Sequence, residues 1–458
     1  MPLTNSNNKL GLQFFYCSLS FLLVSMCSCV SAVRPFDDTN AYVYQGNFNQ
    51  ARIQLESDKD LLYKDTDLVL YELDSGILSH YAGLYEQSNS ELSDAERAME
   101  AAFTKSISQA IGSYIVNDNL VDYAGEEYED IYTNVFMALN YLHLGSTEDA
   151  FVEIRRFDNK LKNISLKYLG AIQKATLEAK ENNLTTDTKY SNKSLTFHNS
   201  ALARYISMIM YYDSGDLDSA IVDKKYIQSA FQNQGQLYNF PMPTAVENLF
   251  APRNRDLCTL HFVSLNGKAP YKAEEVFRTF NEDTGSYFKL SLPVLIARPS
   301  SVYTTVARVV NENGEVIASI PLEKIESIEN IAFDTFQQRQ AFLYIKTFLR
   351  AMTKTTSSSV ITSTLNDSVS NSDSGSLLST LFQLVTSIAI ETTEQADLRT
   401  SQFLPNSVLV GSVAVPPGNY GVSVEYYNQT GILVYVKDFT NIKVSHDNIN
   451  LVESICQK

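Results

Sequence analysis

The chain has 458 residues, of which 44% are hydrophobic, and its formal net charge is −16. This length and apolar content are enough for two or three domains with proper cores. The negative charge argues against a nucleic-acid partner, because nucleic-acid-binding surfaces neutralise phosphates with clustered Lys and Arg. It also argues against electrostatic docking on anionic lipid, so membrane attachment would need a covalent anchor.

The first 28 residues predict an export signal. Lys9 precedes the apolar run LGLQFFYCSLSFLLVSM, which is short for a membrane span and is interrupted by Ser, Gln and Tyr. Small residues follow the run, as they do at signal cleavage sites. A membrane anchor that stays in place is the alternative interpretation.

Two cysteines follow this run in the sequence Met26-Cys27-Ser28-Cys29. A cysteine behind an export signal, preceded by a small residue, resembles a bacterial lipobox, in which the thiol is acylated and the signal is removed. Cys29 fits best and Cys27 is the second choice for the lipid anchor, with residues 29–37 as a tether. The alternative is cleavage near Ala32, which gives a soluble secreted protein.

If Cys29 is acylated, Cys258 and Cys456 remain in the mature chain. In an oxidising compartment these two could form a disulfide that ties the C-terminal tail to the middle region. Such a bond requires Cα atoms within about 7 Å of one another. Two unpaired thiols that lie far apart are the alternative.

A short spacing rule occurs four times in the first half of the chain. An apolar helical run ends in Gly, and a small residue stands five positions later: Gly46 and Ala51, Gly83 and Ser88, Gly145 and Ala150, Gly215 and Ala220. Glycine ends a helix because it adopts the left-handed conformation without steric cost. The polar residue after it can cap the next helix, and the small residue lets the two helices pack closely. The rule predicts helix hairpins.

This turn resembles the turn of the tetratricopeptide repeat (TPR), whose unit is about 34 residues long. The intervals between successive glycines are 37 residues (46 to 83), 62 residues (83 to 145) and 70 residues (145 to 215). One interval fits a single unit, and the others fit about two units with degenerate intermediate copies. The resemblance implies a TPR-like helical repeat domain over residues 38–240.

The stretch from Asn117 to Glu129, NDNLVDYAGEEYE, breaks the helical period with turn-forming residues. Functional sites are often found on such loops of a rigid scaffold. The candidate functional residues in it are Asp118, Asn119, Tyr123, Gly125, Glu126 and Glu129. Its glutamates could act as general acids or bases. A solvated acidic turn is the alternative, because a general acid usually needs burial.

The pattern changes after residue 240. Residues 241–256 contain prolines and predict a linker, and apolar alternation then predicts strands at 257–265, 287–297, 302–310, 315–320, 407–415, 420–427 and 432–439. Helices are expected at about 333–352 and 377–399. We therefore predict an α+β domain at 257–445, followed by a tail at 446–458. The predicted fold is an all-α TPR-like solenoid followed by an α+β module with a mostly antiparallel sheet.

A Ser/Thr-rich stretch at 353–376 predicts a mobile insert in the second domain. Charged residues flank it and form a candidate polar cluster: Arg350, Lys354, Glu394, Asp397 and Arg399. If the two flanking helices pack together, these side chains form ion pairs at the edge of the domain. A small-ligand or peptide site at the same place is the functional hypothesis.

Several segments together resemble a family of uncharacterised bacterial lipoproteins with TPR-like repeats. They are SHYAGLYEQSNSELSDAER, NDNLVDYAGEEYEDIYTNVFMALNYLHLG, HFVSLNGKAP, QRQAFLYIKTFLRAMTK and EQADLRTSQFLPNSVLVGSVAVPPGNY. The resemblance covers about Ala41 to Tyr427 in the same order. It implies a lipid-anchored envelope protein, and it carries no established activity. In some members the gene lies near that of a penicillin-binding-protein activator, which hints at work on the cell wall.

The sequence contains no recognisable catalytic or cofactor motif. No two of its histidines lie within four residues of each other, which excludes an HExxH zinc site: His80, His143, His198, His261 and His446. Walker, GxSxG and GxGxxG motifs are also absent from the sequence. We therefore assign no catalytic, cofactor-binding or metal-binding residue and expect no cofactor.

These patterns favour a scaffold or adaptor that is lipid-anchored on the periplasmic side of the envelope, at the outer membrane. Helical-repeat arrays offer extended concave surfaces and no intrinsic chemistry, so we expect a protein partner on such a surface, in cell-wall or envelope assembly. One alternative is a hydrolase of envelope polymers that uses carboxylates of the 117–129 loop. The other is a structural subunit of a homo-oligomeric envelope assembly.

Overall fold

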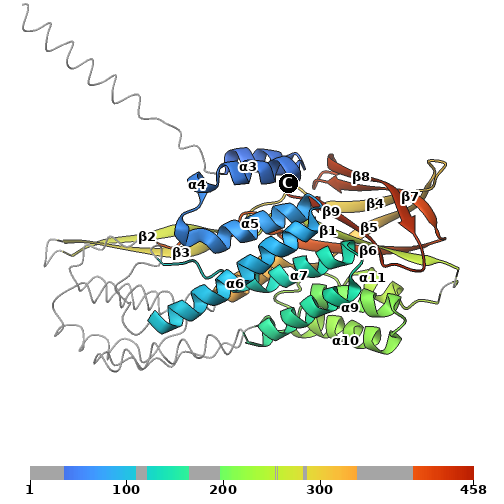
Figure 1. The fold of residues 1–458 in the computed structure, drawn as a ribbon, viewed down its shortest axis with the longest axis horizontal. Coiled ribbons are helices and arrows are strands. Elements are labelled where there is room, and N and C mark those ends of the chain that lie inside the picture. The colour runs from blue at the N-terminus through green and yellow to red at the C-terminus, as the bar shows by residue number, and fades with distance from the viewer. Residues whose placement is uncertain are drawn as a thin grey trace, which may run out of the picture.

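A computed structural model describes residues 36–109, 121–163, 196–252, 254, 256–281, 286–337 and 396–458. A strongly curved sheet occupies the right-hand end of the molecule in Figure 1. The helices of the N-terminal half pack along one side of this sheet. The described C-terminus lies next to the first helices, so the two ends of the folded chain are close together.

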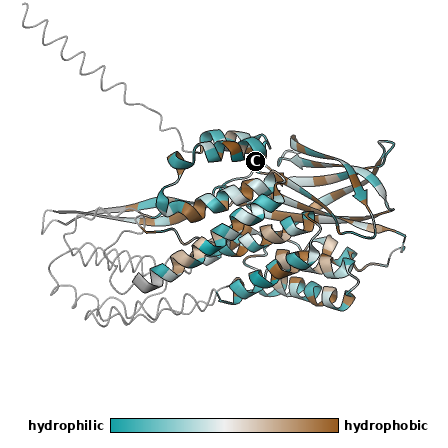
Figure 2. Cartoon of the chain, in the orientation of Figure 1, coloured by the Kyte–Doolittle hydropathy of each residue, from teal (hydrophilic) through white to brown (hydrophobic). Residues whose placement is uncertain are grey.

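The described helices follow one another along the first half of the chain. The series is α2 (Asp37–Tyr44), α3 (Phe48–Ser57), α4 (Lys59–Leu62), the 3-10 turn η1 (Asp65–Asp67), α5 (Leu68–Tyr81), α6 (Tyr85–Gln109), α7 (Glu127–His143), a helix over 147–163, α9 (Ala201–Asp213), α10 (Leu217–Asn233) and α11 (Thr244–Asn248). A further helix begins at residue 328. Hydrophilic and hydrophobic segments alternate along the long helices (Figure 2), as expected for helices with one buried face.

The predicted hairpin turns lie at the four glycines of the spacing rule. Gly46, Gly83, Gly145 and Gly215 all have φ between 75° and 84°. The N–H of each glycine donates to the carbonyl of the residue three positions earlier, as Gly83 does to His80. The N–H of the next residue donates to the carbonyl five positions before it, as Leu84 does to Ser79. This is the hydrogen-bond pattern of a Schellman helix end. The small residues five positions later, Ala51, Ser88, Ala150 and Ala220, are fully buried.

The seven-stranded sheet has the order β8-β7-β4-β5-β6-β1-β9. Its strands are β1 (Cys258–Asn266), β4 (Thr304–Val310), β5 (Val316–Ser327), β6 (Ser407–Val415), β7 (Gly418–Tyr427), β8 (Leu433–Val444) and β9 (Asn450–Cys456). Strand β9 runs parallel to β1, whereas the other neighbours run antiparallel. The edge strands β8 and β9 approach each other, so the sheet nearly closes into a barrel. Strands β2 (Tyr271–Asn281) and β3 (Ser286–Ile296) form a separate antiparallel hairpin.

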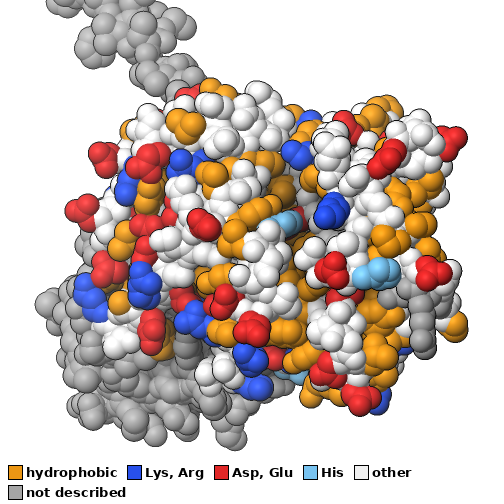
Figure 3. All heavy atoms as spheres, turned by 45° about the vertical axis from the view of Figure 1, so that its right-hand side comes forward, with side chains coloured by type: hydrophobic (Ala, Val, Ile, Leu, Met, Phe, Trp, Pro, Cys, Tyr) orange, Lys and Arg blue, Asp and Glu red, His pale blue; other side chains and the backbone are white. Residues whose placement is uncertain are grey.

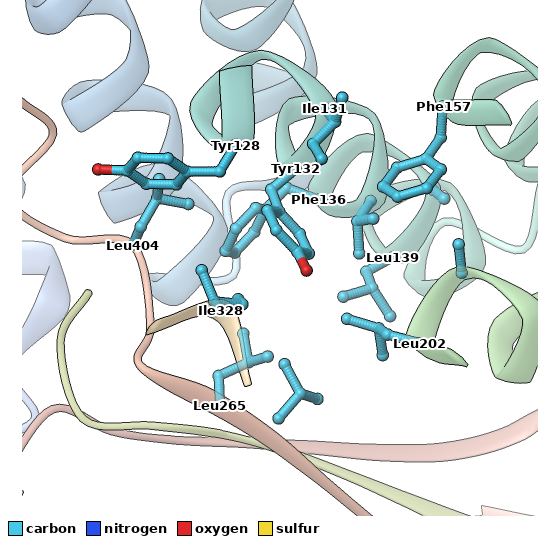
Figure 4. Close-up of a cluster of buried hydrophobic side chains, with 14 of the residues drawn as sticks. Tyr128, Ile131, Tyr132, Phe136, Leu139, Phe157, Leu202, Leu265, Ile328 and Leu404 are labelled. Atoms are coloured by element: carbon cyan, nitrogen blue, oxygen red, sulfur yellow. The ribbon is translucent and has the colours of Figure 1, made fainter. Parts of the chain in front are cut away.

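Two hydrophobic cores lie on the two sides of this sheet. Residues of β1 alternate between them: Leu260 and Phe262 belong to the core inside the near-barrel, and Val263 and Leu265 to the core beneath the helices. The alternation follows from the two-residue period of a strand. In the second core, the aromatic face of α7 meets Leu265, Ile328 and Leu404 (Figure 4).

The predicted fold class is wrong in two respects. The helical hairpins do not stack into a TPR-like solenoid with a free concave surface, because their apolar faces are buried against the sheet in one continuous core. The C-terminal sheet is a large near-barrel that is mixed, because β9 pairs parallel with β1, and it shares a core with the helices instead of forming the expected separate module with a mostly antiparallel sheet. Local turn geometry can be predicted from a glycine spacing, but the surface against which an apolar helix face packs is set by the tertiary structure.

The C-terminal residues also differ from the prediction. The sequence predicts a tail at 446–458, and the structure has strand β9 there. Cys258 and Cys456 are both buried and are not joined by the possible disulfide, which agrees with the alternative of two separate thiols. Cys456 is level with Asn266 at the far end of β1 from Cys258, about 26 Å away along an eight-residue strand path. Burial raises the pKa of the Cys456 thiol to about 11, which makes it unreactive.

Candidate functional site

A segment without regular secondary structure, residues 396–406, lies largely buried between the helices and the sheet, with Leu398 exposed. Thr400, Ser401, Phe403 and Leu404 are each at most 3% exposed. Buried backbone N–H and C=O groups need hydrogen-bond partners, and an irregular segment has no strand neighbour to supply them all. Side chains from the helices therefore complete its hydrogen bonding. We call residues 396–406 the buried segment.

Two helix carboxylates accept hydrogen bonds from this buried segment. Glu129 on α7 accepts from the Ser401 N–H at 2.6 Å and from the Thr400 hydroxyl at 3.1 Å. Its second oxygen accepts from the Tyr123 hydroxyl at 2.7 Å and the Glu126 N–H at 2.8 Å. All four acceptor positions of this carboxylate are therefore occupied by the chain itself.

Asp74 on α5 makes the equivalent contact one residue further along the buried segment. One of its oxygens accepts from the Ser401 hydroxyl at 2.7 Å and from the Gln402 N–H at 2.9 Å. The other accepts from the Tyr63 hydroxyl at 2.9 Å. Helices α5 and α7 are thus attached to three consecutive residues of the buried segment, Thr400 to Gln402, and share Ser401.

Burial raises the pKa of both carboxyl groups toward neutrality. Loss of solvation, assisted by the charge of nearby Glu126, raises the pKa of Glu129 to about 7. Loss of solvation raises the pKa of Asp74 to about 6, even though the hydrogen bonds from Ser401, Gln402 and Tyr63 oppose this shift. Both groups therefore change charge close to physiological pH.

Cationic side chains surround the same segment. Arg399 pairs with Asp397 at 2.9 Å and with Asp67 at 3.2 Å. Its guanidinium also donates to the Val121 carbonyl at 2.9 Å and lies 5.1 Å from the centre of the Tyr123 ring. Burial alone would raise the pKa of Asp397, but the hydrogen bonds and charge of Arg399 hold it at about 2. Arg399 therefore connects η1, the 121–129 stretch and the buried segment.

Strand β2 and the residues before it add two amines, the buried Lys272 and the half-buried Lys268. Lys272 forms an ion pair with Glu126, and both side chains are at most 4% exposed. Lys268 donates to the Asn40 side chain at 2.5 Å and lies 5.5 Å from the Phe403 ring. Burial, with the charge of Arg298, lowers the pKa of Lys268 to about 8.

Glu326 forms a second centre where β5 meets the ends of α7 and α9. Its carboxylate accepts hydrogen bonds from the hydroxyls of Tyr132, Ser200 and Tyr238. It also accepts from the Leu202 N–H at 3.1 Å, which is one of the free donors at the start of α9. Burial raises the pKa of this group. Glu326 thus fixes the start of α9 to the sheet.

A third centre joins β9 to α5 and α7. Glu453 points to the helix side of its strand, where His80 Nε2 lies 3.0 Å and His143 Nε2 2.6 Å from its two oxygens. Burial alone would raise the pKa of Glu453, but the charges and hydrogen bonds of the two histidines hold it far below its usual range. Burial alone would lower the pKa of His80, and the charge of Glu453 outweighs this and raises it.

The structure brings together two groups of residues that the sequence analysis treats separately. Tyr123 and Glu129 from the predicted loop contact Arg399 and the buried segment, where Arg399 pairs with Asp397. The predicted solvated turn is not found at Glu126 and Glu129, which are at most 2% exposed. Gly125 adopts φ 77° just before α7. Five of the other candidate residues lie outside the described residues, as do both anchor cysteines: Asp118, Asn119, Arg350, Lys354, Glu394, Cys27 and Cys29.

Sequence reasoning missed several members of this network. Asp74, Glu326 and Glu453 belong to no motif, and from the sequence each could equally well be a solvated charge on an exposed face. The only available signal is position: Glu453 stands between Leu451 and Ile455 in the alternation of β9, on the side that packs beneath the helices. A charged residue in register with core positions predicts a buried partner.

The network is built for holding elements together. Its carboxylates are matched to hydroxyls, backbone N–H groups and cations of the chain, which is how buried charge is made tolerable. Among the described residues, no group of three or more His, Cys, Asp or Glu side chains is arranged to hold a metal ion. In the same residues, no helix has the length and apolarity needed to cross a bilayer. Comparison of the chain with protein-family models, curated proteins and solved structures gave no match.

Proposed function

We propose that this chain is a non-catalytic binding protein of the bacterial cell envelope, exported, attached to a membrane through a lipid on Cys29, and holding a protein partner. The observation that carries the proposal is the saturation of the buried carboxylates. Both oxygens of Glu129 accept two hydrogen bonds each from the chain, and one oxygen of Asp74 does the same. A catalytic acid or base needs an atom within reach of substrate. A binding protein needs a rigid framework, and this network supplies one because it fixes the helices and the sheet to each other.

The surface of the strands supports a binding role. Hydrophobic side chains gather over the strand-bearing side of the molecule, among scattered charges (Figure 3). Grouped apolar side chains at a surface are a feature of protein interaction sites. The large exposed ones near the ends of the sheet strands are Tyr303, Val316, Ile317, Ile432 and Leu433.

The envelope location rests on the sequence. The apolar run before Met26-Cys27-Ser28-Cys29 and the resemblance to bacterial lipoproteins both support export and acylation. The net charge of −16 supports a lipid anchor over electrostatic attachment, because a negative protein is repelled by anionic lipid.

The anchor is tested by expressing the full chain in a bacterium supplied with a fatty acid that carries a clickable label. We expect the wild type and Cys27→Ala to incorporate the label and Cys29→Ala to lose both the label and membrane association. Labelling that survives Cys29→Ala, or an unlabelled wild type, would contradict the anchor.

The binding role is tested by photo-crosslinking in living cells. A photoreactive residue is placed in turn at Tyr303, Ile317 and Ile432 on the strand surface, and at Glu148 on a helix surface as the matched exposed control. We expect a discrete adduct with another envelope protein from at least one strand position and none from Glu148. An absence of adducts at all three strand positions contradicts the proposal.

One observation favours the hydrolase as a second candidate. Carboxyl groups with pKa values of about 7 and 6, here Glu129 and Asp74, are typical of acid–base catalysts. Purified full-length protein is incubated with cell-wall polymer and soluble products are measured. The hydrolase requires product release that Glu129→Gln abolishes, whereas the binding protein releases no product in either form.

A further inference from the structure

Helix α10 has hydrophobic residues on two opposite faces. Its inner face, against α9, buries Ala220, Ile227 and Ala230. Its outer face exposes four large apolar side chains by between 39% and 50%: Leu217, Ile221, Val222 and Tyr226. A surface helix normally keeps its outer face polar, and a helix that is apolar on both sides is normally covered on both sides. The outer face of α10 therefore has the composition of an interface.

The outer face also has internal symmetry. Asp218 and Lys225 are seven residues apart, about two helical turns, and so lie on the same side of the helix. They are equally distant from the midpoint between Ile221 and Val222, as are Leu217 and Tyr226. Neither Asp218 nor Lys225 has an ion-pair partner within the part of the chain that the structure describes. The neighbouring Lys224, by contrast, pairs with Glu247 at 2.5 Å.

We propose that this face binds a second copy of the same chain, with the two α10 helices antiparallel about a twofold axis at Ile221 and Val222. In this arrangement Asp218 of each copy is level with Lys225 of the second copy, which gives two equivalent ion pairs. Ile221 meets Ile221 on one side of the seam and Val222 meets Val222 on the other, while Leu217 and Tyr226 extend the apolar contact. A twofold interface requires such a self-complementary surface.

The position of α10 in the fold permits this contact. It packs on α9 and lies along the lower edge of the molecule in Figure 1. The Tyr226 ring is already held from the inner side by Arg204, whose guanidinium carbon lies 4.6 Å from the ring centre, so little side-chain freedom is lost when its other face is covered. A single helix pair buries about 1,000 Å², the lower end of the range for specific interfaces, so the dimer dissociates on dilution.

The test exploits the two charges. Two differently tagged copies of the full chain are expressed together in one bacterium, and capture of one tag is followed by measurement of the other. Wild-type copies capture each other. Asp218→Lys places four positive charges in the seam, and Lys225→Asp places four negative charges there. Capture between two copies of the same variant is therefore at least about tenfold lower than between wild-type copies. When the Asp218→Lys copy is paired with the Lys225→Asp copy, opposite charges meet at both positions and capture returns.

A matched control is Glu148→Lys, which changes an exposed acid in the first turn of another helix and leaves capture unchanged. Recovery in the mixed pair also shows that both variants are folded, because misfolded copies cannot restore each other. Three results overturn the proposal: wild-type copies that do not capture each other, single variants that self-capture within twofold of wild type, and a mixed pair that stays apart. The first result would leave the face to a different protein, and the last would contradict the pairing of Asp218 with Lys225.

Discussion

The two sides of the large sheet are packed in different ways. Inside the near-barrel the core is apolar, and polar groups are neutral and paired with one another, as in the contact of Ser264 with Tyr426 at 3.0 Å. On the other side, the two buried carboxylates of the described strands, Glu326 and Glu453, both face the helices. The helix carboxylates Asp74 and Glu129 add to this side.

This difference teaches how the two halves are assembled. A near-barrel satisfies its backbone through strand pairing, so its interior needs only apolar filling. The helices have no backbone ladder with the sheet and meet it partly through an irregular segment, so charged side chains complete the hydrogen bonding there. The contribution of the barrel interior to the free energy of unfolding should therefore be insensitive to pH. The contribution of the contacts between the helices and the sheet should change with pH.

The largest effect is expected from Glu129→Ala. It leaves four donors without an acceptor inside the protein, including the Ser401 N–H and the Tyr123 hydroxyl. We expect a loss of about 3–5 kcal/mol in the free energy of unfolding, measured by denaturant titration. The exposed Glu148→Ala on the next helix is the control and should change the free energy by less than about 0.5 kcal/mol. A loss from Glu129→Ala as small as that of the control would show that the network does not stabilise the fold.

Leu260→Ala is the corresponding change inside the near-barrel. Leu260 is fully buried in the apolar core, and its truncation removes methyl groups and leaves a cavity. We expect a loss of about 3 kcal/mol. Because no charge is involved, this loss should be equal at pH 5.5 and pH 8 within error, whereas the loss from Glu129→Ala should differ between them. An equal pH dependence for the two variants would contradict the comparison.

The wild-type protein should be more stable at pH 5.5 than at pH 8. The folded pKa values of Glu129, about 7, and Asp74, about 6, lie above their ordinary values of 4.5 and 3.8, so protonation favours the folded state. The raised pKa of His80 acts in the same direction, because its stabilising charge is lost as pH rises. The stabilisation of Glu453, whose folded pKa is lowered, is lost only under more acidic conditions. We expect a decrease of about 2–3 kcal/mol across this window.

Denaturant midpoints at several pH values measure this decrease. The double variant Asp74→Asn with Glu129→Gln, which cannot titrate at these positions, should flatten the profile. A wild-type stability that rises from pH 5.5 to pH 8 would mean that these carboxyl groups are not held in the surroundings described.

The helix hairpins could be predicted from the sequence because their cause is local. Gly83 and Gly215 end helices for a reason contained in one residue, the absence of a Cβ, and the small residue five positions later is read from the same short stretch. The strand alternation near β4 and β7 is local in the same sense. What the helices pack against is not local, since the same amphipathic face fits another repeat or a sheet.

The polar network could be predicted only in part. The loop around Tyr123 and the charges near Arg399 stand out by composition, but they are separated by more than 270 residues, as the contact between Val121 and Arg399 shows. Nothing in either stretch specifies the other. Glu453 and His80 are even further apart, at 373 positions. Such pairs become visible only when the register of β9 against β1 is known.

The smallest effect is expected from Gly215→Ala, in the turn between α9 and α10. Here φ is +84° and no other atom lies within 4 Å of where a Cβ would stand, so the cost is that of the left-handed backbone alone, about 1–2 kcal/mol. Gly235, with equally open surroundings and no positive φ, is the matched control, and Gly235→Ala should be neutral or slightly stabilising. Thermal unfolding of both variants measures the difference. If Gly215→Ala cost as much as Glu129→Ala, the turns and not the buried carboxylates would hold the helices in place.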